Sequence, residues 1–143
     1  MPVSAPLETA VTDLLIGAKQ LLKRVHEEWY GGELSWSQIS TIIRLERGGP
    51  ATTADLARAE GVTPQSMGTA LAGLEAAGLV QRNPHPTDGR QMLYGLTDTG
   101  LAARTTAVGI KRAWLRRAAA ELTPTEQRTL VEAAALVRRL KQL

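Results

Sequence analysis

The chain has 143 residues, of which 43% are hydrophobic and 3% aromatic. This length favours one domain, and the absence of cysteine excludes disulfides, thiolate ligands and thiol redox chemistry. No apolar run approaches the length of a membrane span and the N-terminus lacks a secretory pattern, which favours a cytoplasmic protein. The net charge of +3 invites a nucleic-acid partner, but the positive excess lies in residues 101–143, so charge alone does not identify one.

The first predicted element is a long amphipathic helix over residues 7–29, whose apolar residues recur at three- and four-residue steps. Gly31 and Gly32 end it. A second helix follows, because Ser35 in "SWSQ" can cap it and Gln38 can reach back as a capping box. The stretch "RGGP" stops that helix near Gly48.

Two short helices joined by the tight turn "EGV" come next. Thr52 caps the first, which ends at Glu60, and Thr63 caps the second, which Gly78 closes. The second helix has an apolar stripe and an outer face of small or polar residues that can approach base edges closely, namely Gln65, Ser66, Gly68 and Thr69. An ordinary helical hairpin with a solvated face is the alternative.

Two strand candidates, "LVQR" and "QMLYGLT", flank the loop "RNPHPTDGRQ". The prolines stiffen this loop, and Asp88-Gly89 favours a tight turn, in which Gly89 is free to take a positive φ. The turn projects Arg90, which suits the narrow minor groove of DNA, and Asp88 can orient Arg82 or Arg90 through a carboxylate pair. The alternative is a solvated hairpin tip with an incidental surface pair.

The chain ends in two further helices. Thr97 caps the first, over about residues 98–120, and Thr123 caps the second, with Pro124 first and Glu126 completing a capping box. The order of elements predicts a mainly α fold with a small β-hairpin wing, a winged helix-turn-helix. Because the winged helix has its own core, the apolar stripes of the first and last helices need a partner surface, which predicts a dimer.

In the motifs "LSWSQ", "TTADLARAEGVTPQSMGTALAGLEAAGLVQR", "DGR", "YGLTDTG" and "LTPTEQRTL", the sequence resembles the MarR family of bacterial transcription regulators. The resemblance implies one domain over 1–143, with a DNA-binding part at 35–97 and dimerisation helices at 5–32 and 98–143. It also implies a homodimer on a palindromic operator, with the helix from Thr63 in the major groove and the wing from Arg82 to Arg90 in the minor groove. Most members of the family repress, and many release DNA on binding small aromatic or anionic ligands.

Two departures from the family pattern concern the reading helix. Family members commonly carry a basic residue there, but this chain has none between Thr63 and Gly78. Gly68 and Gly73 also lie inside the helix, and each weakens it by up to ~1 kcal/mol relative to alanine. The departures bear on site specificity and affinity more than on the fold.

An aromatic group at the junction of the first two helices is the candidate effector site: His26, Trp29, Tyr30 and Trp36. It would take a planar ligand with His26 or Tyr30 as polar anchor, or else fill the junction core. We expect no cofactor, metal site or enzymatic activity. The predicted function is a sequence-specific DNA-binding repressor released by a small ligand, and the alternative is a winged-helix interaction module with little DNA affinity.

Overall fold

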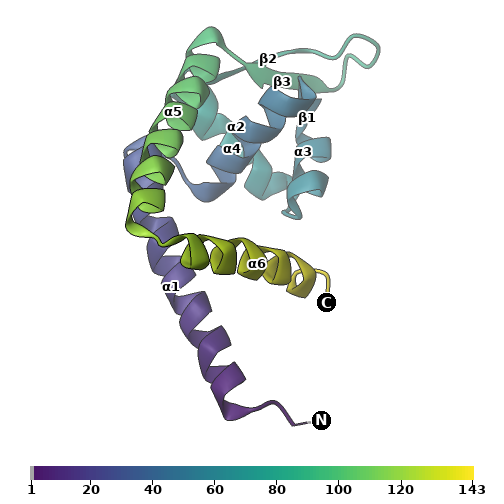
Figure 1. The fold of residues 1–143 in the computed structure, drawn as a ribbon. Helices are drawn as coiled ribbons and strands as arrows, with labels where there is room; N and C mark the ends of the chain where they lie inside the picture. Colours follow the sequence, from purple (N-terminus) through teal and green to yellow (C-terminus); the bar gives the residue numbers. More distant parts are fainter. Residues whose placement is uncertain (1) are drawn as a thin grey trace. The chain divides into compact units, whose positions relative to one another are not determined.

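The computed structural model describes residues 2–143 (Figure 1). The chain forms two compact units, of which the first ends at Val108 and the second is Gly109–Leu143. The elements in chain order are α1 (Ala5–Tyr30), α2 (Trp36–Gly48), β1 (Ala51–Thr52), α3 (Thr53–Glu60), α4 (Pro64–Ala76), β2 (Val80–Pro84), β3 (Met92–Leu96), α5 (Asp98–Glu121) and α6 (Pro124–Leu140). The mainly helical fold with a small β-hairpin is therefore confirmed. No helix within residues 2–143 has the length and apolar character needed to cross a membrane.

The predicted helix caps are present. The Ser35 hydroxyl accepts from Gln38 N at 3.2 Å, and the Gln38 side chain accepts from Ser35 N at 2.9 Å, which forms the capping box of α2. Thr123 and Glu126 form the same reciprocal pair at the start of α6. These side chains satisfy backbone N–H groups that have no partner inside the helix, so each helix begins where its cap stands.

The core of the first unit lies between α2, α3, α4 and the sheet. Its fully buried side chains are Ile42, Leu56, Met67, Leu71, Leu74, Val80 and Thr41. The α4 members recur at the three- and four-residue spacing of one helix face, which leaves the opposite face of α4 to solvent.

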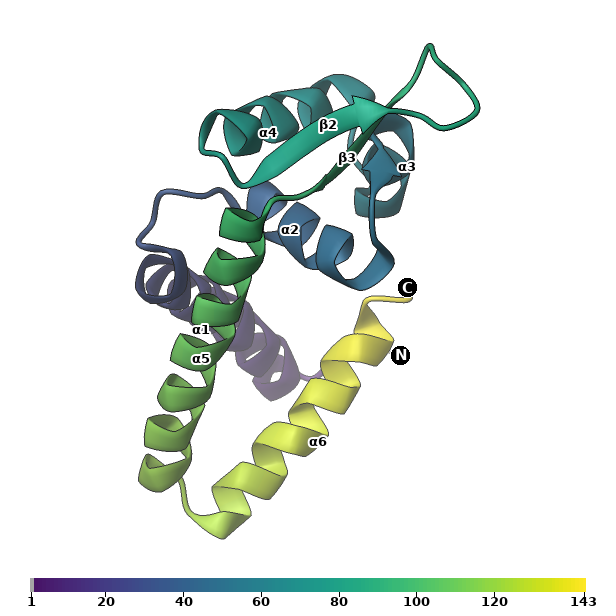
Figure 2. The same cartoon turned by 90° about the horizontal axis from the view of Figure 1, so that it is seen from above.

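The sheet has the order β1-β3-β2, and both pairings are antiparallel. Strand β2 pairs with β3 from Val80 opposite Leu96 to Pro84 opposite Met92. Strand β1 is only two residues long, and the sequence pattern did not predict it, because a two-residue strand carries no detectable alternation. In Figure 2 the loop between β2 and β3 projects beyond both strands.

Two glycines permit close approach between elements. A Cβ at Gly73 would lie 2.5 Å from Nε2 of Gln38, whose side chain also donates to the Ala70 carbonyl at 3.4 Å. A Cβ at Gly100 would collide with the backbone carbonyl of Leu79. At Gly73 the nearby atom is the end of a flexible side chain, which could move, whereas at Gly100 it is backbone, so only Gly100 is required for close approach.

Candidate nucleic-acid interface

The outer face of α4 presents neutral side chains. Thr63 caps the helix, because its hydroxyl accepts from Ser66 N at 3.1 Å. Gln65, Ser66 and Thr69 are exposed, and Gly68 is half-buried. The Thr69 hydroxyl donates to the Gln65 carbonyl at 3.1 Å, so its oxygen is left to accept a hydrogen bond from outside. The residues expected on the outer face of α4 are therefore accessible from outside.

A polar brace holds α3 against α2. Glu60 accepts from Arg44 Nε at 2.7 Å and from Ser40 Oγ at 2.8 Å. Burial works to raise the pKa of Glu60, but the hydrogen bonds from Arg44 and Ser40, together with the Arg44 charge, hold this pKa below its ordinary value. The brace therefore contributes stability at neutral pH and loses it as the pH falls through the lowered pKa.

His85 organises the tip of the wing. Its Nδ1 accepts from Thr87 N at 3.2 Å and from Asp88 N at 3.1 Å, while His85 N donates to the Gln91 carbonyl at 3.1 Å. An imidazole nitrogen that accepts two backbone N–H groups acts like a helix cap for the turn. The imidazole of His85 thus closes the loop from inside, a role that the sequence pattern did not predict.

The tip presents Arg90, whose side chain is 97% exposed. Asp88 Oδ1 accepts from the backbone N of Arg90 at 3.1 Å, and it lies 3.9 Å from Arg90 Nε. Asp88 therefore holds mainly the backbone of Arg90 and reaches its guanidinium only at the limit of an ion pair. Gly89 does not use its freedom to take a positive φ, because the positive-φ glycines among the described residues are Gly31, Gly32, Gly49, Gly61 and Gly78. The His85 and Asp88 hydrogen bonds shape the turn without it.

Arg82 lies at the base of the wing, not at its tip. Its Nε is 3.4 Å from Glu75 Oε2, so the guanidinium ties β2 to the end of α4. Of the two arginines proposed as partners of Asp88, the structure brings only Arg90 near it. Arg82 keeps 56% of its side chain exposed, which leaves it accessible to a further partner beside Glu75.

A hollow of about 340 Å³ lies between the start of α3 and the wing, and its lining includes Thr52, Thr53, Arg90 and Tyr94. Thr52 itself is buried, at 8% exposure, and its hydroxyl caps α3 by accepting from Asp55 N at 3.1 Å. The structure therefore brings two predicted site residues, Thr52 and Arg90, to one hollow. Arg90 supplies the only charge in its lining.

Comparison with known proteins places the chain in a family. The sequence model of the MarR family matches residues 34–92. The HTH-type transcriptional regulator Mb0904 of Mycobacterium bovis is 33% identical over 126 residues, which is 88% of each chain. The chain belongs to the MarR family.

Two further similarities agree with this assignment. The HTH-type transcriptional repressor Rv2887 of Mycobacterium tuberculosis is 42% identical to this MarR-family protein over 77 residues, 54% of this chain and 55% of Rv2887. The crystal structure of RV1404 from Mycobacterium tuberculosis superposes with a TM-score of 0.80 at 27% identity, covering 97% of this chain and 95% of the other. This MarR-family protein is thus a DNA-binding transcription regulator with the winged helix-turn-helix fold.

The aromatic group of this MarR-family protein is partly assembled. The rings of His26 and Trp36 lie 5.3 Å apart at 36°, and His26 Nε2 is hydrogen-bonded to the Leu34 carbonyl. Trp29 and Tyr30 are half-buried, and the buried Tyr30 hydroxyl has no hydrogen-bond partner among the described residues. Of the two proposed polar anchors, His26 already has one ring nitrogen in a hydrogen bond, whereas the Tyr30 hydroxyl has no hydrogen bond among the described residues.

Replacing His85 with alanine is expected to loosen the wing tip without unfolding the protein, because two loop N–H groups lose their acceptor while the core is untouched. Amide hydrogen exchange should accelerate at Thr87 and Asp88. His85→Asn should restore part of the protection, since a short amide oxygen can accept from backbone N–H groups two residues on. Unchanged exchange at both amides in His85→Ala would show that the imidazole does not close the loop.

Proposed function

We propose that this MarR-family protein is a homodimeric repressor that binds a palindromic operator through α4 and the wing and is released by a small planar ligand. The observation that carries the proposal is the pairing of a neutral, exposed α4 face with a hydrogen-bonded wing that presents a 97% exposed Arg90. The first can enter a major groove, and the second suits the electronegative minor groove beside it.

The proposed contacts follow from the chemistry of each group. The amide of Gln65 and the hydroxyls of Ser66 and Thr69 can exchange hydrogen bonds with base edges, while Gly68 allows close approach. Thr63 and Thr52 cap α4 and α3, so they set the position of both helix starts. In the wing, Arg90 is the proposed minor-groove contact, Arg82 a phosphate contact and Asp88 the group that holds the Arg90 backbone.

Operator binding should weaken with salt. Neutralised phosphates release counterions, and six to ten contacts would lower affinity by roughly 10³–10⁵ between 50 and 200 mM salt. With no basic residue between Thr63 and Gly78, we expect the low end. Titration of a labelled operator duplex at the two salt concentrations measures the slope. A flat response, or no saturable binding at either concentration, would favour the interaction module instead.

The apolar surfaces of the terminal helices support the dimer. Large hydrophobic side chains on α1 and α6 are exposed within the single chain, among them Leu7, Leu14, Leu21, Leu130, Val137 and Leu140. Complete burial of such a side chain contributes about 1.5–3 kcal/mol, and because each is about half exposed, a second copy of the chain can supply roughly half of that per residue. The three on α1 recur every seven residues, and the three on α6 are separated by seven and three residues, so each set lies on one face of its helix.

Sedimentation should show a dimer at micromolar concentration. A Leu130→Glu, Val137→Glu double variant should shift the population toward monomer, because it places two charges on the proposed packing face of α6. Glu132→Gln, an exposed change on the same helix, serves as the control and should remain dimeric. A wild-type monomer at this concentration would defeat the dimer proposal.

The ligand part of the proposal rests on the aromatic group. The His26–Trp36 pair offers a ring face for a planar molecule, and the unpartnered Tyr30 hydroxyl offers a hydrogen bond. Trp29, in the last turn of α1, completes the set. A ligand held there would act on the segment that joins α1 to α2.

A further inference from the structure

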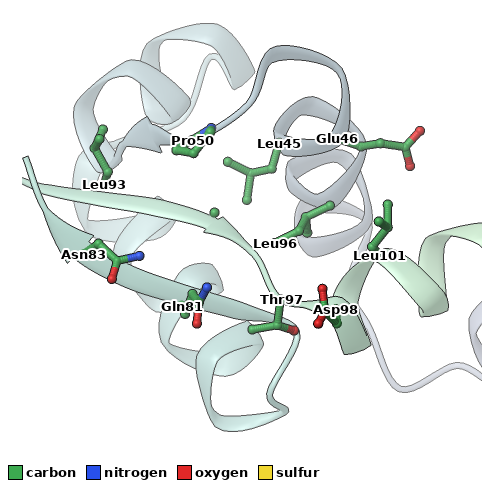
Figure 3. A pocket seen from close by; sticks show the side chains of 11 residues that line it. Leu45, Glu46, Pro50, Gln81, Asn83, Leu93, Leu96, Thr97, Asp98 and Leu101 are labelled. Carbon is green, nitrogen blue, oxygen red and sulfur yellow. The ribbon is translucent and has the colours of Figure 1, made fainter.

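A second hollow, of about 380 Å³, lies on the outer face of the wing sheet (Figure 3). Leu45 and Glu46 of α2, Pro50, residues of β2 and β3, and the start of α5 line it. None of the residues proposed for operator or ligand binding belongs to this lining. The hollow is therefore separate from both the aromatic group and the DNA-facing side of α4.

Strand alternation produces this hollow. Val80 of β2 is buried in the core, so Gln81 and Asn83 of the same strand face outward. Their partners on β3 are Gly95 opposite Gln81 and Leu93 opposite Asn83. A Cβ at Gly95 would lie 3.4 Å from Pro50 Cγ, so the missing side chain leaves the floor open where any other residue would begin to fill it.

The walls combine an apolar surface with a polar rim. Leu93 and Leu96 of β3 and Leu101 of α5 supply apolar contact, and Leu101 is 49% exposed. Gln81 and Asn83 supply amide donors and acceptors along β2, as Figure 3 shows. Predominantly apolar walls with a few convergent polar groups are typical of small-molecule sites, and about 300 Å³ is their lower size limit.

The charge of the lining is negative. Its two charged residues are Glu46 and Asp98, and no lysine, arginine or histidine takes part. Glu46 Oε2 lies 3.0 Å from Arg104 Nε, so that carboxylate is already compensated. Asp98 is exposed in the first turn of α5 and forms none of the ion pairs found within residues 2–143.

We propose that this hollow binds a small organic ammonium compound with a flat apolar body. The body lies on Leu93 and Leu101 over the open floor at Gly95, and the ammonium group faces Asp98. An anion of the same shape would meet the carboxylate of Asp98, which has no ion-pair partner among the described residues, whereas Arg104 already compensates Glu46. The site therefore selects by charge as well as by shape.

Naphthalen-1-ylmethylamine and 1-naphthoate are matched probes for the test, because they share the ring system and differ in charge. Titrated into the ¹⁵N-labelled full chain, the amine should shift the amides of Gly95 and Leu101 in a saturable way. The naphthoate should leave both amides in place. Equal shifts from both probes, or amine shifts confined to the amides of His26 and Trp36, would overturn the proposal.

Two variants of the lining, with one control, distinguish the contribution of the Asp98 charge from that of the apolar wall. Asp98→Asn should weaken the amine by up to about fivefold, the upper end for an exposed charge pair, while Thr97 still caps α5. Asp13→Asn removes the same charge from exposed α1 and should leave amine binding unchanged. Leu101→Ala, at a half-exposed position, should weaken the amine as well. Wild-type affinity in both Asp98→Asn and Leu101→Ala would also overturn the proposal.

Discussion

Replacing Arg90 with alanine is expected to weaken operator binding by about 1–3 kcal/mol for each wing. The side chain is 97% exposed, so the protein itself gains little from it, and folding and dimerisation should survive its loss. The tip that presents it is closed by backbone N–H groups that donate to His85 Nδ1 and Asp88 Oδ1, which reduces the entropy lost on binding. Titration of the operator, recovered by sequencing DNA that co-purifies with the protein, measures the change at physiological salt.

Three further variants test whether the effect is specific to the Arg90 guanidinium. Arg90→Lys should recover only part of the affinity, because an ammonium lacks the planar fork of a guanidinium. Asp88→Ala should cost less than Arg90→Ala, since Asp88 holds the backbone of Arg90. Arg139→Ala removes an exposed arginine from α6 and should matter little. Wild-type affinity in Arg90→Ala would show that the wing is only a loop.

Gly100→Ala is expected to destabilise the protein by about 1–3 kcal/mol or more, the usual cost of overpacking. The added Cβ would collide with the Leu79 carbonyl, which also accepts from Thr97 N at 3.1 Å. Leu79 belongs to the core at 9% exposure, so its backbone cannot move away without disturbing the packing of the core. Thermal or urea unfolding measures the loss.

Gly109→Ala is the matched control for Gly100→Ala. It lies in the same helix, and a Cβ there meets nothing within 4 Å. Alanine should therefore stabilise at this position by up to about 1 kcal/mol, because it is the better helix former. The two substitutions should move the unfolding midpoint in opposite directions. Equal effects would mean that the approach of α5 to Leu79 does not constrain residue 100.

The local signals in the sequence predicted the helices well. Ser35 with Gln38, and Thr123 with Glu126, act between residues three apart, so their spacing alone reveals the caps. The buried face of α4 was equally predictable, because its apolar residues recur with the helical period and the same residues are buried in the structure. The resemblance to the MarR family then supplied the arrangement of these elements, which local patterns do not contain.

The details of the wing were less predictable. The acceptor role of His85 depends on where the loop closes, and the Arg82–Glu75 pair joins β2 to α4 across the packed unit. Nothing in the spacing of these residues indicates either contact. The hollow beside Gly95 requires knowing which residues of β2 and β3 face each other, and register emerges only from the folded hairpin.

The neutral outer face of α4 also bears on how the regulator would search a chromosome. Cationic side chains bind any duplex, because phosphates are the same at every sequence. A reading helix without cationic side chains adds little to binding at random sequences, so random sites would compete weakly for the protein. Whether the operator is occupied depends on how much more tightly the protein binds it than random DNA, weighed against some 10⁶–10⁹ competing random sites. A modest affinity for the operator could then suffice for occupancy, because few molecules would be held elsewhere.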